Sequence, residues 1–272
     1  LHNTGMSGKG GNHADTKKSK KTPEPTVAVG TSSNGFVGKT IQYVGRSAHA
    51  ADAPDQGINA LNAAMLGIMG INSLRETFRD EDAIRVHPII TKGGDLVNNV
   101  PDDVRIETYV RAKTMEAIEK THKKVDAALR AGGMAIGAEV HIDTMPGHLP
   151  LVCNATLNEL LVENAKEAFP SVKIINAGHF SASTDMGDVS HLMPAIHPFI
   201  GGTDGLLHGA DFKVVDFNAA ALLPGKAFAG MVIDLLADNA QKAKALLDHY
   251  EPILTKDAYI KKLDSYFSEE EP

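Results

Sequence analysis

The stretch FVGKTIQYVGRSAHAADAPDQGINALNAAMLGIMGINSLRETF, residues 36–78, decides the fold because its hydrophobic period changes once along its length. Val37, Ile41 and Tyr43 alternate with polar neighbours, which is the pattern of a half-buried strand. A bridge rich in glycine and proline follows and predicts a loop. Apolar residues then recur at the spacing of one helix face: Leu61, Met65, Ile68 and Ile71. The stretch therefore predicts a strand, a loop and an amphipathic helix.

The same periodicities continue outward from this stretch to residue 146. They predict strands at 84–91, 104–112 and 139–144, and a helix from the N-cap Thr114 to Gly132–Gly133 with Ile118, Val125 and Leu129 on its apolar face. Turn-prone GGDLVNNVPDD, residues 93–103, joins the first two of these strands. The resulting order, strand–helix–strand–strand–helix–strand over residues 36–146, is the ferredoxin-like arrangement.

The character of the sequence changes after Pro150. It predicts a helix at 155–169, a short strand at 172–175, a glycine- and histidine-rich run at 178–209, and helical sequence to the end. These elements indicate part of an α/β layer. We expect their strands to be too few for a sheet of their own.

Composition excludes several classes of protein. The chain has 272 residues, 43% hydrophobic content and a formal net charge of −7, which argues against a nucleic-acid binder. No apolar run reaches the ~20 uninterrupted residues of a membrane span. The single cysteine, Cys153, forms no internal disulfide, so we expect a reducing cytoplasm. Residues 7–26 lack apolar periodicity and predict a loop.

Three of the twelve histidines stand in glycine- or turn-rich contexts, where backbone can approach a ligand closely: His2, His49 and His208. A lone histidine is more often a structural hydrogen-bonding group than a ligand, so its context decides. The segment Gly45–Leu61 resembles the lid-domain signature Gly-x-x-x-His-x-x-x-Pro-x-x-Gly-x-Asn-Ala of the metal-dependent aminoacylase, carboxypeptidase and amidohydrolase family. The matching residues are Gly45 and His49 and, after one extra residue, Pro54, Gly57, Asn59 and Ala60.

Four more segments carry the same resemblance. Asn98 and Pro101 match the family's Gly-x-x-x-Asn-x-x-Pro turn, and Arg111 falls thirteen positions after Asn98, where the family carries a strand arginine. STDMGDVS and GTDGLLHGADF resemble late catalytic segments of the amidohydrolase branch, which includes p-aminobenzoyl-glutamate hydrolase. LHNTG at the start resembles the Leu-His that closes the first half of the catalytic domain.

The resemblance implies a fold. It is an α/β fold, in which an incomplete α/β catalytic domain carries an inserted ferredoxin-like α+β lid that mediates dimerisation. Residues 1–35 would be the end of the first catalytic half with a flexible loop, 36–146 the lid domain, and 147–272 the second catalytic half.

The resemblance also implies an activity. The family hydrolyses an amide bond beside a carboxylate with a pair of divalent metals, usually zinc or manganese, which activate a shared water. The substrate would be an N-acyl amino acid, an aminobenzoyl-glutamate-like compound or a dipeptide. We expect a homodimer formed through the lid domain, with no nucleic-acid or membrane partner.

The resemblance assigns roles to individual residues. His2 and His208 would ligate metal, and His49 would donate to the carbonyl oxygen, reaching the neighbouring subunit's site. Arg111 and Asn98 would bind the substrate carboxylate. The backbone N–H groups of Gly201 and Gly202 would assist them.

Several family features have no match here. The ligand strand, the bridging acid and the general-base glutamate of the first catalytic half are absent, so the chain looks like a fragment. His13 and Asp15 match a ligand pair only inside a Lys-rich loop, and we reject them. Asp185 and Asp188 fit either a place beside the metals or a helix N-terminus.

Two other functions compete with the enzyme. In the first, the chain is a non-catalytic dimerisation module. The second, a ferredoxin-like RNA or small-molecule binder, is weaker because aromatic residues make up only 5% of the chain.

Overall fold

The computed structural model describes residues 2–3 and 25–267 of the chain. The predicted loop of residues 7–26 and the rejected pair His13 and Asp15 therefore fall wholly or almost wholly outside the described residues. The chain forms two compact units: residues 33–151, 181–188 and 254–272 make one, and residues 1–32, 152–180 and 189–253 make the other. Helices and sheets are mixed in both, so the fold is α/β, as predicted.

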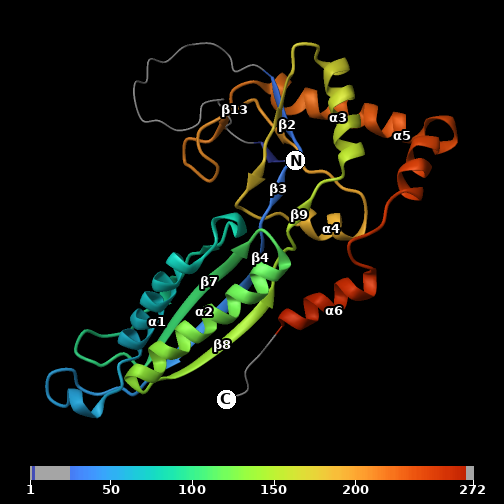
Figure 1. Ribbon diagram of the computed structural model, residues 1–272. Coiled ribbons are helices and arrows are strands. Elements are labelled where there is room, and N and C mark those ends of the chain that lie inside the picture. The colour runs from blue at the N-terminus through green and yellow to red at the C-terminus, as the bar shows by residue number, and fades with distance from the viewer. Residues whose placement is uncertain (1, 4–24, 268–272) are drawn as a thin grey trace. The chain divides into compact units, whose positions relative to one another are not determined.

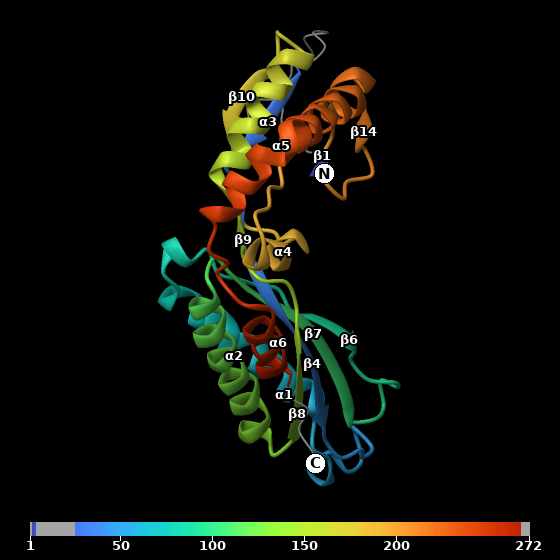
Figure 2. The same ribbon diagram turned by 90° about the vertical axis from the view of Figure 1, so that its right-hand side faces the viewer.

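The first unit is built on an antiparallel sheet in the order β5-β7-β4-β8, with β6 also paired to β7 (Figure 1). Its strands are β4 (Gly35–Val44), β5 (Arg85–Val86), β6 (Ile89–Lys92), β7 (Asp103–Ala112) and β8 (Glu139–Pro146). Helices α1 (Ala60–Leu74) and α2 (Met115–Ile136) pack on each other and on one face of this sheet (Figure 2). The alternation of Val37, Ile41 and Tyr43 is confirmed, since all three side chains are fully buried.

Two predicted boundaries in this unit were wrong. The strand predicted at 84–91 divides into β5 and β6, because Pro88 between them has no N–H for the ladder. The second helix runs past Gly132 and ends at Gly137, whose φ of +81° makes the left-handed cap. At Gly132 a Cβ would lie 2.4 Å from the carbonyl oxygen of Ala63, so this glycine marks a close crossing with α1 and not a helix end.

The second unit contains a mixed four-stranded sheet in the order β1-β12-β2-β10. Its strands are β1 (His2–Asn3), β2 (Thr26–Val29), β10 (Lys173–Asn176) and β12 (Phe199–Ile200). Helices α3 (Ala155–Ala168) and α5 (Leu223–Asp248) pack together in this unit. The expectation that the strands after residue 150 are too few for a sheet of their own is confirmed, because β10 and β12 are joined through β2. The sequence pattern did not reveal β2.

The remaining elements are short. They are β3 (Ser32–Ser33), β9 (Leu151–Val152), β11 (His179–Phe180), β13 (Thr203–Asp204), β14 (Lys213–Val214), α4 (Met186–Leu192), α6 (Lys256–Tyr266), three 3-10 turns at Pro54–Gln56, Arg75–Thr77 and Asp80–Asp82, and a π-helical turn at Asn218–Leu222. The last of these runs directly into α5.

Residues 218–248 are long and apolar enough, by length and composition, to cross a membrane. A search for uninterrupted apolar runs misses this stretch. The backbone leaves helical geometry over residues 237–240, and Leu223, Ala227 and Met231 are buried in one core with Leu161 of α3. One such helix is weak evidence for a membrane span, because core helices share these properties. Only one side of its first half reaches the core of its unit, since Val232, Ile233 and Leu236 are exposed.

Candidate functional site

The loop that carries His49 is bonded to the turn predicted at residues 93–103. The N–H of Ala50 donates to the carbonyl of Asn98 at 2.8 Å, and the N–H of Val100 donates to the carbonyl of Ala48 at 2.9 Å. His49 and Asn99 form an antiparallel bridge between these bonds. The structure therefore brings His49 and Asn98, two residues singled out from the sequence, into one two-loop ladder.

The His49 side chain is exposed. Its Nδ1 accepts hydrogen bonds from the backbone N–H groups of Ala51, at 3.3 Å, and Asp52, at 3.1 Å. An acceptor nitrogen carries no proton, so the neutral ring holds its proton on Nε2. These two bonds orient the ring and leave the Nε2–H as the outward donor.

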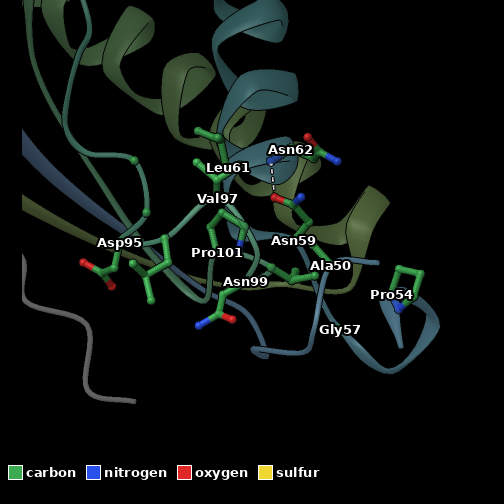
Figure 3. A pocket seen from close by; sticks show the side chains of 14 residues that line it. Ala50, Pro54, Gly57, Asn59, Leu61, Asn62, Asp95, Val97, Asn99 and Pro101 are labelled. Atoms are coloured by element: carbon green, nitrogen blue, oxygen red, sulfur yellow. Dashed lines mark hydrogen bonds between the residues drawn. The ribbon is translucent and has the colours of Figure 1, made fainter. Parts of the chain in front are cut away.

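A cavity of about 670 Å³ lies beside this ladder (Figure 3). Its lining comes from the His49 loop, the start of α1 and the turn at 93–101; polar members are Asn59, Asn62, Asp95 and Asn99, and apolar members include Leu61, Val97 and Pro101. Asn59 caps α1, since its Oδ1 accepts from the N–H of Asn62 at 3.0 Å. The fully exposed side chain of Val97 leaves an apolar group at the rim for a ligand to cover.

Arg111 lies at the opposite end of the same sheet. It pairs with Phe36, whereas the turn that carries Asn98 enters β7 at Asp103, opposite Val44. Eight residues at about 3.4 Å each separate Asp103 from Arg111, a distance of roughly 27 Å. One copy of the chain therefore does not bring His49 and Asn98 together with Arg111.

Arg111 itself occupies a half-buried position suited to an anion. Its Nη1 donates to Ser183 Oγ at 2.7 Å, and its guanidinium lies 4.9 Å from the ring centroid of Phe36 and 5.1 Å from that of Tyr109. Burial lowers the pKa of this guanidinium. Within residues 25–267 no carboxylate pairs with it. A half-buried cation on an aromatic platform, without a counter-ion, favours binding of an anionic ligand.

The remaining predicted site residues lie in the second unit. The N–H of Gly201 donates to the carbonyl of Thr26 at 2.9 Å, so it is not free for a substrate, contrary to the expectation from sequence. Gly202 has a φ of +102°, and its carbonyl accepts from the N–H groups of Val215 and Asp216. In the structure, these two glycines therefore make backbone hydrogen bonds within the second unit.

The two predicted metal ligands are carried by different sheets of the second unit. His2 stands in β1 opposite Phe199 of β12. His208 is exposed in the loop between β13 and β14, with a φ of +62°. The roles of His2 and His208 as metal ligands stay predictions.

Comparison with known proteins identifies the family. Residues 20–135 match the model of the M20 peptidase dimerisation domain. The curated Xaa-Arg dipeptidase of Mus musculus is 34% identical over 206 residues, covering 72% of this chain and 47% of that protein. The chain belongs to the M20 family of metallopeptidases and amidohydrolases. It spans about half the length (47%) of that curated relative.

Two solved structures show the same fold. AtUAH in complex with (S)-hydroxyglycine superposes with a TM-score of 0.63 at 15% identity, covering 77% of this chain and 49% of that one. The aminobenzoyl-glutamate utilization protein of Klebsiella pneumoniae gives 0.51 at 20% identity, covering 62% and 43%. At such identities these likenesses show the M20 fold alone.

M20 peptidases are generally metal-dependent, but the described residues do not form a metal centre. Among residues 2–3 and 25–267 no three histidine, cysteine, aspartate or glutamate side chains gather closely enough to hold an ion. Structural and catalytic zinc sites use at least three protein ligands. We therefore derive no step of the chemistry through a metal.

This chain is expected to retain zinc poorly. Because two histidines do not fill a tetrahedral site, zinc should be stripped by a competing chromophoric chelator during titration. The check is metal content of the purified chain after dialysis against the metal-free buffer. Two ions held stoichiometrically and tightly would contradict this expectation and show that further ligands exist in the M20 chain.

Three other residues discussed from the sequence have defined surroundings. Asp188 bonds His148, its Oδ2 lying 3.0 Å from Nδ1, and its Oδ1 accepts from the N–H of Leu149 at 3.2 Å. The hydroxyl of Thr184 donates to Asp185 and lowers the pKa of that carboxyl. Cys153 is a half-buried free thiol, and burial raises its pKa. None of them gathers with other metal-ligand candidates within the described part of the chain.

Sequence reasoning missed His148 and Ser183 as members of the Arg111 environment. His148 lies two residues after the end of β8, and its partner Asp188 is forty positions away, so no local spacing connects them. The only available signal was that Ser183 and Asp188 fall inside the STDMGDVS segment that carried the family resemblance.

Proposed function

We propose that the chain is part of a homodimeric M20 hydrolase that cleaves an amide bond next to a free carboxylate, in a dipeptide or an N-acyl amino acid. The matched relative is named for Xaa-Arg dipeptides, so these are the first substrates to test. The proposal includes a pair of divalent ions, zinc or manganese, in the whole protein, where they would polarise the scissile carbonyl.

The observation that carries the proposal is the fixed tautomer of His49. Both backbone bonds to Nδ1 orient the ring so that Nε2–H is presented outward. When the carbonyl carbon is attacked, negative charge develops on its oxygen, and a preorganised N–H donor stabilises that charge without rearrangement. An exposed structural histidine has no need of this orientation.

The separation of His49 from Arg111 supports a dimeric site. Roughly 27 Å lie between the sheet ends that carry them, which is longer than a dipeptide of two residues at about 3.4 Å each. We therefore assign the two residues to different active sites of one dimer. His49 of each subunit would serve the site in which the other subunit supplies Arg111, in an isologous arrangement.

Mixing two inactive variants tests this arrangement. His49→Ala and Arg111→Ala homodimers, prepared in the catalytically complete protein, are each expected to have little activity. After dissociation and reassembly together, half of the dimers are heterodimers with one intact site, so activity should return to roughly a quarter of wild type. The measurement is initial rate of dipeptide hydrolysis against mixing ratio.

The control is the double variant carrying both changes, mixed with wild type. Here each heterodimer has one damaged residue in each site, so no intact site is made beyond those of wild-type dimers. Absence of recovery in the first mixture, with heterodimers present by mass spectrometry, would refute sharing of His49 between subunits.

A non-catalytic dimerisation module is the second candidate. The observation that favours it is the lack of a three-ligand cluster in the described residues. If the catalytically complete protein hydrolyses no dipeptide or N-acyl amino acid with zinc or manganese supplied, while it still dimerises, the module is the correct function.

A further inference from the structure

His148 and Asp188 form a hydrogen-bonded pair at the Arg111 end of the sheet. His148 follows β8 and Asp188 lies in α4. Ionised Asp188 only accepts hydrogen bonds, so the short contact to Nδ1 requires that His148 carries its proton there. The Nε2 atom is then the free end of a ring that is 39% exposed, whereas Asp188 is 16% exposed. The pair thus has the form of an oriented imidazole with one reactive nitrogen outward.

The carboxylate of Asp188 is held by two donors. Besides the Nδ1–H of His148, it accepts from the backbone N–H of Leu149. A carboxylate that is fixed by neighbouring donors fixes its histidine in turn, as the aspartate does in other Asp–His pairs. The orientation of His148 is therefore built into the unit and is not an accident of an exposed side chain.

His148 and Arg111 contact the same aromatic ring. The Phe36 centroid lies 5.4 Å from that of His148, edge-on at 84°, and 4.9 Å from the Arg111 guanidinium carbon. Ser183, which accepts from Arg111, stands five positions before Asp188 in one segment. Phe36 thus contacts both an oriented imidazole and a guanidinium that has no carboxylate partner among residues 25–267, so one amino-acid-sized ligand could meet both groups.

We propose that His148, oriented by Asp188, is a second recognition residue for the carboxylate-bearing end of the ligand that Arg111 binds. The inference rests on the proposed function, because it takes that end to be a carboxylate. In its protonated form His148 donates Nε2–H to the anion, adding a second charge-assisted hydrogen bond to those of Arg111. Among the described residues, the acidic groups near the ring are Asp188 of α4, which bonds it, and Asp185, which precedes α4.

Binding of a blocked amino acid to the full chain tests the proposal. The probe is N-acetyl-arginine, and its matched control is N-acetyl-argininamide, which lacks the carboxylate. Two-dimensional NMR follows the ring Cε1–H signal of His148 and the Nε–H signal of Arg111. The carboxylate probe should move both signals, and the amide probe should move neither.

His148→Gln should weaken the binding of N-acetyl-arginine about tenfold at pH 6, because one charge-assisted hydrogen bond to the carboxylate is lost. Asp188→Asn keeps a hydrogen-bonding side chain but no charge, so it should weaken this binding by a smaller factor. His141→Gln, a change at another histidine of the same unit, is the control and should leave the affinity unchanged.

The outcomes separate the two proposals. If the Arg111 signal moves while the His148 signal stays still, His148 is not a recognition residue, and the Arg111 site stands. If the probe moves neither signal, the carboxylate site at Arg111 is wrong and this inference falls with it. A folded His148→Gln variant with wild-type affinity at pH 6 also overturns it.

Discussion

Replacing His49 by alanine is expected to lower kcat by roughly two to three orders of magnitude in the catalytically complete protein, the usual loss for one oxyanion donor. The free energy of unfolding should change little, by about 0.5 kcal/mol or less, because the ring is exposed and its two bonds go to N–H groups that water can reach. The measurements are steady-state kinetics of dipeptide hydrolysis and urea unfolding of the same preparations.

Two conservative variants test the roles of the two ring nitrogens of His49 separately. The amide oxygen of asparagine replaces Nδ1 and should keep the bonds to Ala51 and Asp52, so His49→Asn should fold normally and stay inactive. The longer glutamine places an N–H donor near the position of Nε2, so His49→Gln should recover part of kcat. Full turnover in His49→Ala, combined with earlier unfolding, would make His49 a packing residue.

Replacing Asp126 by alanine is expected to destabilise the fold by about 3 kcal/mol, because it leaves a buried ammonium group without its counter-ion. The Lys39 side chain is fully buried, with Nζ 2.7 Å from Asp126 Oδ1 and 2.8 Å from Thr144 Oγ1. His122 of α2 also borders this pair. Urea unfolding at pH 7 measures the change.

A second substitution at the same place is the control. Lys39→Met in the Asp126→Ala background removes the stranded charge and should recover most of the lost stability. A double variant as unstable as the single one would show that packing, and not charge, explains the loss.

The stabilisation by Asp126 also depends on pH. Burial acts to raise the pKa of this carboxyl, but hydrogen bonds from His122 and Lys39 outweigh it, so the pKa is lowered in the folded state. A group with a lowered folded pKa contributes stability at neutral pH and loses it as pH falls through that value. The difference in stability between wild type and the Asp126→Ala variant should therefore shrink in acid.

Local hydrophobic periodicity predicts most of the strands and helices of the first unit. Alternation at Val37, Ile41 and Tyr43 and the N-cap at Thr114 are properties of neighbouring residues, and both appear in the structure. The end of α2 was misplaced because Gly132 has its role in a crossing with α1, which the sequence of α2 alone does not encode. Strand β2 was missed because four residues beside a polar loop carry too little pattern.

The candidate site likewise contains residues that local motifs predict and residues that only the structure reveals. His49 and Asn98 were found because each stands in a local motif, and backbone bonds between their loops bring them together. Their distance from Arg111 follows from the register of β4 and β7, which no motif spacing expresses. The pairing of His148 with Asp188 depends on α4 packing against the turn after β8, so only the structure reveals it.

The two-loop ladder at His49 makes the orientation of the imidazole depend on the number of residues in each loop as well as on the side chains. Besides the bonds of Ala50 and Val100, the N–H of Ala60 donates to the carbonyl of Pro101 at 2.9 Å, at the start of α1. An insertion between residues 98 and 101 would shift this register and turn the imidazole away even with every named residue retained. An insertion at the exposed tip, residues 95–97, would leave the register intact and reshape only the cavity rim. The length of the tip can therefore change the cavity without moving the imidazole that we propose as the oxyanion donor.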